Sequence, residues 1–396
     1  MNGGPSLSYE FVSPQCIVFG WGRRREVGGL AKTLGRRAFI VCGAQALVDG
    51  GIVEEISGSL RQEGITPALT ETISHEPEVD DVDRLAASLR GQGAGRGDFV
   101  VAIGGGAAID LGKAVGVMTT NNESPTVKDY LESVGRGLKI VNDPLPLLAM
   151  PTTAGAGAEA TRNAVISCYD PPFKKSLRDT RLLPKVALVD PELSVSVPPA
   201  TTAASGMDAI AQLIESYISR KAEPIPQALA LQGLKLAISS IAEAVRDGQS
   251  RMARERMAHA ALLSGMCLAN SGLGMAHGVA AALGVNHRVP HGVACALMLP
   301  VALRVNRRVR QGELAQLARS LFGQGPSSSP EGAVEMFIRV IEKLCEGVGV
   351  PKRLSQLGVT REHIPALVAG SRGSSMSGNP RDLSDEELTQ ILEDIL

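Results

Sequence analysis

The chain has 396 residues, of which 44% are hydrophobic and 20% charged, and its formal net charge at pH 7 is -1. This balance excludes a large basic surface for nucleic acid and an acidic, solvating chain. Aromatic residues, at 3%, are too few to build a stacking platform for single strands. The length suits one large or two ordinary domains around a substantial apolar core. We therefore expect a globular enzyme that binds neither nucleic acid nor membrane.

Three features of the sequence bear on cellular location. No run of about 18 apolar residues is uninterrupted, so we expect no membrane span. The N-terminal stretch MNGGPSLSYEF has no basic start followed by an apolar segment, so we expect no signal peptide. The cysteines are dispersed and form no C-x-x-C pair, which indicates a reduced, cytoplasmic protein. They are Cys16, Cys42, Cys168, Cys267, Cys295 and Cys345.

The first half of the chain alternates strand-like and helix-like segments. RRAFIVCGAQAL, from Arg36, and DFVVAIGGGAAIDLGKAVGVM, from Asp98, each read as a short apolar strand, a glycine turn and a helix. LPLLAMPTT and KVALVDPEL are two further short apolar runs closed by proline. Strands that alternate with helices of ten or more residues predict parallel pairing in a doubly wound α/β sheet.

After Pro198 the strand-like runs disappear. Long segments such as MDAIAQLIESYISR and PQALALQGLKLAISSIAEAV follow, and their apolar residues recur at intervals of three and four, as in amphipathic helices. We therefore predict two domains, an α/β domain over residues 1–190 and an all-helical domain over residues 191–396.

The first candidate site is the triple glycine Gly104, Gly105 and Gly106, between the strand FVVAI and the helix AAIDLGKAV. Glycines let backbone N–H groups approach a ligand, and a helix N-terminus adds partial positive charge, so phosphate is the expected guest. A tight strand-to-helix turn is the alternative. The stretch is neither a G-x-G-x-x-G, because Ile109 or Ala107 stands where that motif needs glycine, nor a P-loop.

The second candidate site is the segment PTTAGAGAE, which includes Thr152 and Thr153 and follows the strand LPLLAM. Doubly wound sheets bind their ligands beyond the carboxyl ends of the strands, where this segment is expected to lie. An ordinary turn is the alternative.

The third candidate site is a sparse set of polar side chains in the helical part. Asp208 and Gln212 are four residues apart and share one helix face. His277 and His291 flank the apolar stretch GVAAALGVNHRVP. A carboxylate and two imidazoles are suitable ligands for a divalent transition metal. The alternative is that these are hydrogen-bonded structural histidines.

Four long motifs in this order carry a family resemblance. GGGAAIDLGK, PTTAGAGAEATRNAVI, DPELSVSVPPATTAASGMDAIAQLIESY and GMAHGVAAALGVNHRVPHGVACALMLP closely resemble the iron-containing (group III) alcohol dehydrogenases. The resemblance runs from the strand near Ile17 to the NPR at residues 379–381. It implies the architecture that this family shares with dehydroquinate synthase-like enzymes, a dinucleotide-binding domain and a helical domain with a metal and substrate cleft between them. It also implies NAD or NADP as cofactor and a homodimer or larger homo-oligomer.

The resemblance assigns roles to residues that match the family's motifs. The triple glycine matches the pyrophosphate loop and Asp110 its acidic position, while Thr152 and Thr153 match threonines that line the cofactor. The family's metal, Fe²⁺ or Zn²⁺ here, has four ligands. Asp208, His277 and His291 match three of them, but Gln212 stands where the family has a histidine. Because an amide oxygen is a weaker ligand than imidazole, the metal is expected to be bound less tightly, exchanged for another ion or absent.

Three further positions depart from the family's pattern. Many relatives carry a proton-relay histidine four residues after the first histidine ligand, where this chain has Ala281; His287 is a substitute candidate, with a surface histidine as the alternative. Gly43 stands where NAD-preferring members often carry aspartate, so the repulsion of a 2′-phosphate is removed and NADP is permitted. Glu76, in HEP, replaces the usual asparagine of PNP.

The predicted function is an NAD(P)-dependent alcohol dehydrogenase or aldehyde reductase. In this mechanism, a divalent cation lowers the pKa of the alcohol or polarises the carbonyl, and hydride passes to or from the nicotinamide. A metal-independent reductase of the maleylacetate reductase type is an alternative, because Gln212 weakens the metal site. A sugar-phosphate cyclase or lyase on the same scaffold is another, with Lys174, Lys175 and Arg162 as candidate phosphate ligands. A nucleotide-binding protein without catalytic activity is a further alternative, but it would not explain the three candidate metal ligands Asp208, His277 and His291. The sequence does not identify the substrate.

Overall fold

The computed structural model describes residues 8–323 and 329–396. Its first part is built on a six-stranded sheet of order β1-β8-β5-β4-β2-β3, in which every neighbouring pair is parallel. The strands are β1 (Cys16–Phe19), β2 (Arg37–Cys42), β3 (Thr66–Thr72), β4 (Asp98–Gly104), β5 (Leu147–Pro151) and β8 (Val186–Val189). The predicted doubly wound parallel sheet is confirmed.

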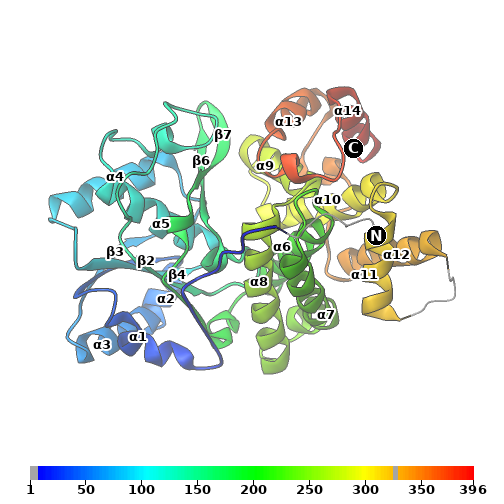
Figure 1. The fold of residues 1–396 in the computed structure, drawn as a ribbon. Coiled ribbons are helices and arrows are strands. Elements are labelled where there is room, and N and C mark those ends of the chain that lie inside the picture. Colours follow the sequence, from blue (N-terminus) through cyan, green and yellow to red (C-terminus); the bar gives the residue numbers. More distant parts are fainter. Residues whose placement is uncertain (1–7, 324–328) are drawn as a thin grey trace.

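The central strand β4 is buried on both faces, which is why it reads as a continuous apolar run. Because successive strand residues point to opposite faces, Val100 and Ala102 belong to the apolar cluster of one face, and Phe99, Val101 and Ile103 to that of the other. Helices cover both faces (Figure 1). They are α1 (Val27–Ala31) and α3 (Ile52–Gln62) on one face and α4 (Val79–Gly91) and α5 (Gly106–Thr120) on the other, with the short α2 (Gln45–Asp49) after β2.

A small antiparallel hairpin stands beside the main sheet and faces the helical part. Its strands are β6 (Asn163–Tyr169) and β7 (Pro172–Arg178), and the Asp170-Pro171 peptide bond in its turn is cis. Both strands contact α9 (Met275–His287) of the helical part. The hairpin therefore forms a wall between the two parts of the chain.

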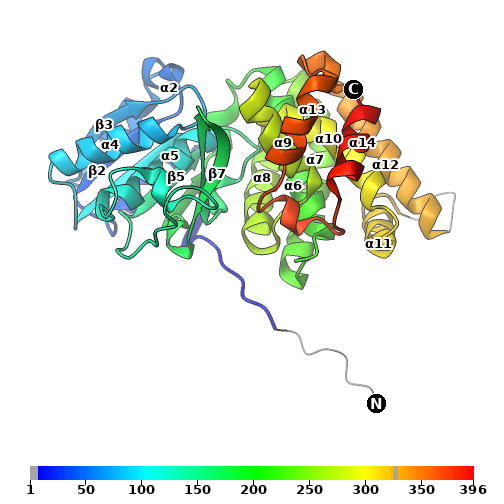
Figure 2. The ribbon, with the colours of Figure 1, turned by 90° about the horizontal axis from the view of Figure 1, so that it is seen from above.

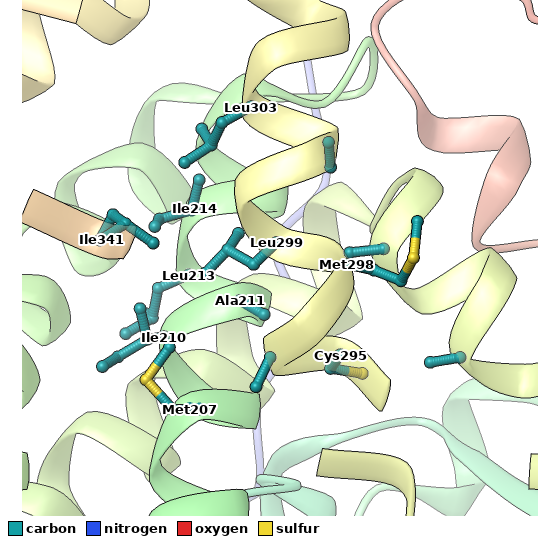
Figure 3. Packing of buried hydrophobic residues seen from close by; sticks show 14 of the residues in the cluster. Met207, Ile210, Ala211, Leu213, Ile214, Cys295, Met298, Leu299, Leu303 and Ile341 are labelled. Carbon is teal, nitrogen blue, oxygen red and sulfur yellow. The ribbon is translucent and has the colours of Figure 1, made fainter. Parts of the chain in front are cut away.

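The second part is a bundle built around α6 (Pro199–Ile218), in which every residue from 206 to 218 is buried. Figure 2 shows this bundle beside the sheet-containing part, and Figure 3 shows side chains of α6 packed against those of α10 (His291–Asn306). Five of the buried residues of α6 are polar, so each needs an internal partner; they are Thr202, Asp208, Gln212, Glu215 and Ser216. The remaining helices are α7 (Pro224–Arg246), α8 (Arg251–Ser271), α11 (Gln311–Phe322), α12 (Pro330–Gly347), α13 (Ile364–Gly370) and α14 (Asp385–Asp394).

Two glycines bring the parts into direct backbone contact. Gly157, in the loop after β5, has φ +61°, and a Cβ atom there would lie 2.5 Å from the Cα of Gly265 in α8. Only glycines allow so close an approach. The threonine- and glycine-containing loop is therefore held against the helical bundle.

The chain changes from strands to long helices between β8 and α6, and the division into domains at residues 1–190 and 191–396 stays a prediction. Among the described residues, α7 is long and apolar enough to cross a membrane, and α8 with α9 passes the same test as a pair bent by 102°. All three helices pack within the bundle, as core helices do. Residues 1–7, which form much of the segment expected not to be a signal peptide, lie outside the described residues.

Candidate active site

A cavity of about 1610 Å³ separates the carboxyl edge of the main sheet from the helical bundle. Of the candidate site residues named in the sequence analysis, all except Gly104 and His287 line this cavity. The lining includes Gly43, Glu76, Gly105, Gly106, Asp110, Thr152, Thr153, Lys174, Asp208, Gln212, His277, Ala281 and His291. The fold therefore brings the three candidate sites to one cleft.

The glycine turn presents backbone groups to this cavity. Gly104 ends β4 with φ +154°, and a Cβ atom there would lie 2.6 Å from the Cα of Gly43. Helix α5 begins at Gly106, so its first N–H groups have no partner within the helix, and its dipole favours an anion there. A Cβ atom on Gly105 would lie 3.3 Å from Oγ1 of Thr153. The turn is shaped to cradle a phosphate group.

Asp110 anchors this wall of the cavity. Its Oδ2 accepts a hydrogen bond from the backbone N–H of Val165 in β6 (3.0 Å), and its Oδ1 has no hydrogen-bond partner and lies 3.8 Å from Nζ of Lys113. Burial raises the pKa of Asp110 to about 6, and burial lowers the pKa of Lys113 to about 8. Lys113 donates to the backbone oxygens of Ala158 and Thr161, among others. The pair thus ties α5 to the hairpin and to the loop after β5.

The opposite wall carries a compact cluster of metal-ligating atoms. Asp208 of α6, His277 of α9 and His291, the first residue of α10, are joined by a fourth residue, Cys295, and their ligand atoms all lie within 4.8 Å of one another. Oδ1 of Asp208 lies 3.2 Å from Nε2 of His277 and 3.9 Å from Nε2 of His291. Asp208 and His277 are 4% and 2% exposed. Taking such polar groups out of water costs free energy. A cation bound between them would compensate that cost.

Protonation in the cluster fits a cation site. Burial, followed by the charge of Lys174, lowers the pKa of His291 to about 4, so its imidazole is neutral at neutral pH, as a ligand must be. Burial works against a charged His277, but Cys295 and the hydrogen bond to Asp208 raise its pKa well above the ordinary value. The pKa of Asp208 is held below its ordinary value despite burial, by the hydrogen bond to His277 and the neighbouring histidines. Without a cation, His277 therefore carries a proton beside the ionised Asp208, and a bound cation replaces that proton. The donor set of carboxylate, imidazoles and thiol fits a divalent transition metal.

Glu215, which the sequence analysis missed, orients His277. Its Oε2 lies 2.7 Å from Nδ1 of His277, while Oε1 accepts the N–H of Ala276 (2.7 Å) and Oε2 that of Gly274 (3.1 Å). The same carboxylate therefore caps the N-terminus of α9 and directs Nε2 of His277 toward the cluster. The signal in the sequence was the spacing: Glu215 lies two helical turns after Asp208.

Gln212 lies beside Asp208, but its amide oxygen is engaged elsewhere. Its Nε2 donates to Oδ2 of Asp208 (3.1 Å), and its Oε1 accepts from the hydroxyl of Ser264 (2.8 Å). The reverse orientation would set the amide oxygen against a carboxylate. In this arrangement Gln212 holds Asp208 in place.

Cys295 was also missed as a site residue, although it lies one helical turn after His291 on the same face. Its Sγ is 3.6 Å from Nε2 of His291, and burial raises its pKa to about 12. Lys174, named from the sequence as a candidate phosphate ligand, forms an ion pair with Glu76, named as a departure from the family's pattern. Nζ of Lys174 lies 2.6 Å from both carboxylate oxygens of Glu76.

The structure does not bring His287 to the cleft. It lies at the end of α9, where its ring packs against that of His363 with centroids 4.4 Å apart. Ala281, at the position of the relay histidine in many relatives, does line the cavity. A proton relay through His287 has no support in this geometry.

Comparison with known proteins agrees with this architecture. Residues 14–191 match the iron-containing alcohol dehydrogenase family model, and residues 202–396 match the C-terminal model of the Fe-containing alcohol dehydrogenase family. The chain is 34% identical to the 1,3-propanediol dehydrogenase of Klebsiella pneumoniae, over 97% of each chain. It is 31% identical to the lactaldehyde reductase of Escherichia coli K12, over 94% of this chain and 96% of the relative. The solved alcohol dehydrogenase from Oenococcus oeni has 31% identity and a TM-score of 0.90, covering 98% of this chain and 100% of that one.

These matches define an NAD(P)-linked oxidoreductase acting on CH–OH groups. The chain belongs to the iron-containing alcohol dehydrogenase family. The predicted family, fold class and enzyme class are therefore confirmed.

Proposed function

We propose that this protein interconverts a small alcohol and its aldehyde or ketone, using NAD(H) or NADP(H) and a divalent cation, Fe²⁺ or Zn²⁺. One observation carries the proposal: the ligand cluster of Asp208, His277 and His291 opens onto the same cavity as residues 105 and 106 of the glycine turn. A nicotinamide held from one wall and an alcohol oxygen held from the other can then meet within a single cleft.

The residues of the chain have separate tasks in this reaction. When bound, the cation polarises the substrate oxygen and the nicotinamide gives or takes the hydride. Gly105 and Gly106 present backbone amides to the pyrophosphate, with Thr152 and Thr153 beside them. Glu215 fixes the ring of His277, and Gln212 fixes the carboxylate of Asp208, so both ligands are held before substrate arrives. The two walls, held together at Gly157 and Gly265, orient the reactants.

The surroundings of Gly43 support the use of NADP as well as NAD. The neighbouring residues that line the cavity, Ala44, Ala46 and Leu47, carry no charge. Without a carboxylate at position 43, a 2′-phosphate meets no close negative charge from this segment. Initial rates with NADPH and NADH in parallel test this point, and a strict requirement for NADH contradicts it.

The proposal extends to the setting of the enzyme. We expect a cytoplasmic homodimer or larger homo-oligomer. All six cysteines are free, which is consistent with a reducing compartment. Light scattering of the purified protein determines its oligomeric state.

A metal-independent reductase of the maleylacetate reductase type is the second candidate. The observation that favours it is Gln212, which replaces a histidine ligand and turns its amide oxygen toward Ser264. The sugar-phosphate cyclase or lyase is less well supported, because the charge of Lys174 is already matched by Glu76.

The deciding experiment is a panel of alcohols and aldehydes with both cofactors, run on protein stripped by a chelator and then supplied with Fe²⁺, Zn²⁺, Mg²⁺ or no metal. We expect net change in NAD(P)H only with a transition metal. Full turnover by metal-free protein, verified by elemental analysis, supports the metal-independent reductase. Turnover of a phosphorylated substrate without net NAD(P)H change supports the cyclase or lyase.

A further inference from the structure

We propose that Cys295 is the fourth protein ligand of the divalent cation, so that the metal centre is formed by Asp208, His277, His291 and Cys295. This inference rests on the proposed function, because it concerns the same cation. It assigns the coordination position that a histidine fills elsewhere in the family to a different helix, α10 in place of α6.

The distances between the candidate ligand atoms match a tetrahedral site. With metal–ligand distances of about 2.0–2.3 Å, neighbouring ligand atoms of a tetrahedron lie about 3.3–3.8 Å apart. Nε2 of His277 lies 3.2 Å from Oδ1 of Asp208, Sγ of Cys295 lies 3.6 Å from Nε2 of His291, and Nε2 of His291 lies 3.9 Å from Oδ1 of Asp208. These three separations thus lie within about 0.1 Å of the tetrahedral range, and all four ligand atoms lie within 4.8 Å of one another.

The position of Cys295 on its helix explains how it joins the set. His291 and Cys295 are four residues apart in α10, so their side chains lie one above the other on one face. In Figure 3, the sulfur of Cys295 points away from Met207 and Ile210 of α6. Cys295 is fully buried and does not line the cavity, whereas Asp208, His277 and His291 do. The thiol therefore approaches the cation from the bundle side and leaves the cavity side open for a substrate oxygen.

The other buried cysteines of the bundle show what an ordinary core thiol does here. Sγ of Cys267 contacts the backbone oxygen of Pro226 (3.2 Å), and Sγ of Cys345 contacts that of Ala296 (3.6 Å). Cys295 faces an imidazole nitrogen and the carboxylate of Asp208 instead. The side chain of Cys295 thus has the neighbours expected of a metal ligand, whereas Cys267 and Cys345 contact only backbone oxygens among the contacts given above.

Gln212 does not compete for this position. Its two polar atoms are both used, one by Oδ2 of Asp208 and the other by Ser264. Because Oδ1 of Asp208 faces the histidines while Oδ2 faces Gln212, the amide can keep its bond when a cation is bound at Oδ1. Gln212 is thus a positioning residue.

A thiolate changes which metal the site prefers. On ligation the cation replaces the thiol proton, which leaves to solvent. Thiolate is a softer ligand than imidazole and favours Zn²⁺ over harder divalent ions. We therefore expect this member of an iron-containing family to retain Zn²⁺ more firmly than Fe²⁺.

Substitution with Co²⁺ tests the inference, because a thiolate bound to Co²⁺ gives an intense near-ultraviolet charge-transfer band that imidazole and carboxylate do not. Stripped full-length protein is titrated with Co²⁺ as the wild type, Cys295→Ser and the matched control Cys267→Ser. We expect the band in the wild type and in the control and its loss in Cys295→Ser. Loss of an outer-shell partner costs about 10- to 100-fold in metal affinity. We expect the affinity of Cys295→Ser for Co²⁺ to fall by more than that, because the variant loses a direct ligand.

The possible results separate this inference from the proposed function. If the wild type binds Co²⁺ but shows no charge-transfer band, ligation by Cys295 is overturned, while the metal site of the proposed function is still supported. A band that survives in Cys295→Ser also overturns it, and failure of the wild type to bind Co²⁺ overturns both. If Cys295→Ser does not fold by circular dichroism, zinc-edge X-ray absorption of the wild type decides, since the inference requires one sulfur at about 2.3 Å.

Discussion

The two walls of the cleft differ in how they are built. On the α/β side the groups offered to a ligand are mostly backbone amides and hydroxyls from residues next to one another, at 105–106 and 152–153. On the helical side they are side chains from three helices, brought together by packing around α6. A site made by the backbone of one turn depends on local geometry, whereas a site made by distant side chains depends on the whole bundle.

The largest effect is expected on the helical wall. His277→Ala removes a ligand whose other nitrogen is held by Glu215, and the remaining buried carboxylates then lack their partner. We expect kcat/KM to fall by roughly 10³-fold or more, because metal assistance contributes several kcal/mol to the barrier. Steady-state rates and elemental analysis measure the loss of activity and of bound metal.

The matched control for this variant is His259→Ala. His259 lies on α8, packs against Phe19 with ring centroids 5.1 Å apart and does not line the cavity. It should keep its metal and near wild-type rates. Near wild-type activity of His277→Ala would instead remove the metal from the mechanism and favour the metal-independent reductase.

A smaller effect is expected from the carboxylate behind the ligand. Glu215→Gln keeps the shape of the side chain but removes its negative charge. The carboxylate orients His277 and accepts N–H groups at the start of α9, and the amide can do this only in part. Loss of such an outer partner costs about 10- to 100-fold in metal affinity or activity. Competition with a chelator measures the affinity.

Ser216→Ala is the comparison for Glu215→Gln, since Ser216 is the next residue of α6 and its hydroxyl donates to the backbone oxygen of Gly272 (2.9 Å), away from the ligand cluster. It is expected to leave metal affinity unchanged. Equal losses in both variants would show that the effect comes from the packing of α6 and not from the orientation of His277.

On the α/β wall, the expected effect falls on cofactor binding. Gly104→Ala forces a side chain into a backbone conformation with φ +154° and against the Cα of Gly43. Strain of about 1–3 kcal/mol displaces the turn, so dinucleotide affinity should drop by roughly tenfold or more while metal content stays the same. Fluorescence titration with NADH and NADPH measures this. Gly58→Ala, in α3 with open space around it, should change neither quantity.

The two walls also differ in how well the sequence predicts them, because one is built from neighbouring residues and the other from side chains far apart in the chain. The strand-turn-helix pattern around Gly104 is local, so periodicity alone located it, together with the doubly wound sheet. Asp208, His277 and His291 were candidates from their residue types alone, with structural histidines as the alternative. The family resemblance was needed to favour a metal site, because no local pattern shows that α6, α9 and α10 converge. Glu215 and Cys295 were missed, because both read as ordinary positions of apolar helices until the fold places them beside His277 and His291. His287 shows the same limit: its closeness in sequence to His291 does not place it among the residues that line the cleft.

The smallest expected effect concerns a buried carboxylate in the loop that joins the walls. Glu159, in the short helix at 158–160 after β5, is 2% exposed, and burial raises its pKa to about 7 from the ordinary 4.5. Because the folded state then binds a proton more tightly than the unfolded chain does, this group lowers stability as pH rises from about 4.5 to 7. Glu159→Gln imitates the protonated form at every pH.

The free energy of unfolding is measured by urea denaturation at several pH values. Between pH 5 and pH 8, the stability of Glu159→Gln relative to the wild type should therefore increase. The gain is at most about 3 kcal/mol, from 1.36 kcal/mol per unit of pKa shift. The exposed Glu362→Gln should show no such trend. A constant difference between Glu159→Gln and the wild type across this range would mean that Glu159 is ionised in the folded protein. Its charge would then be compensated by Lys113, whose attraction lowers the pKa of Glu159. The loop would then be held to α5 by charge, in addition to being held to α8 by the close contact of Gly157 with Gly265.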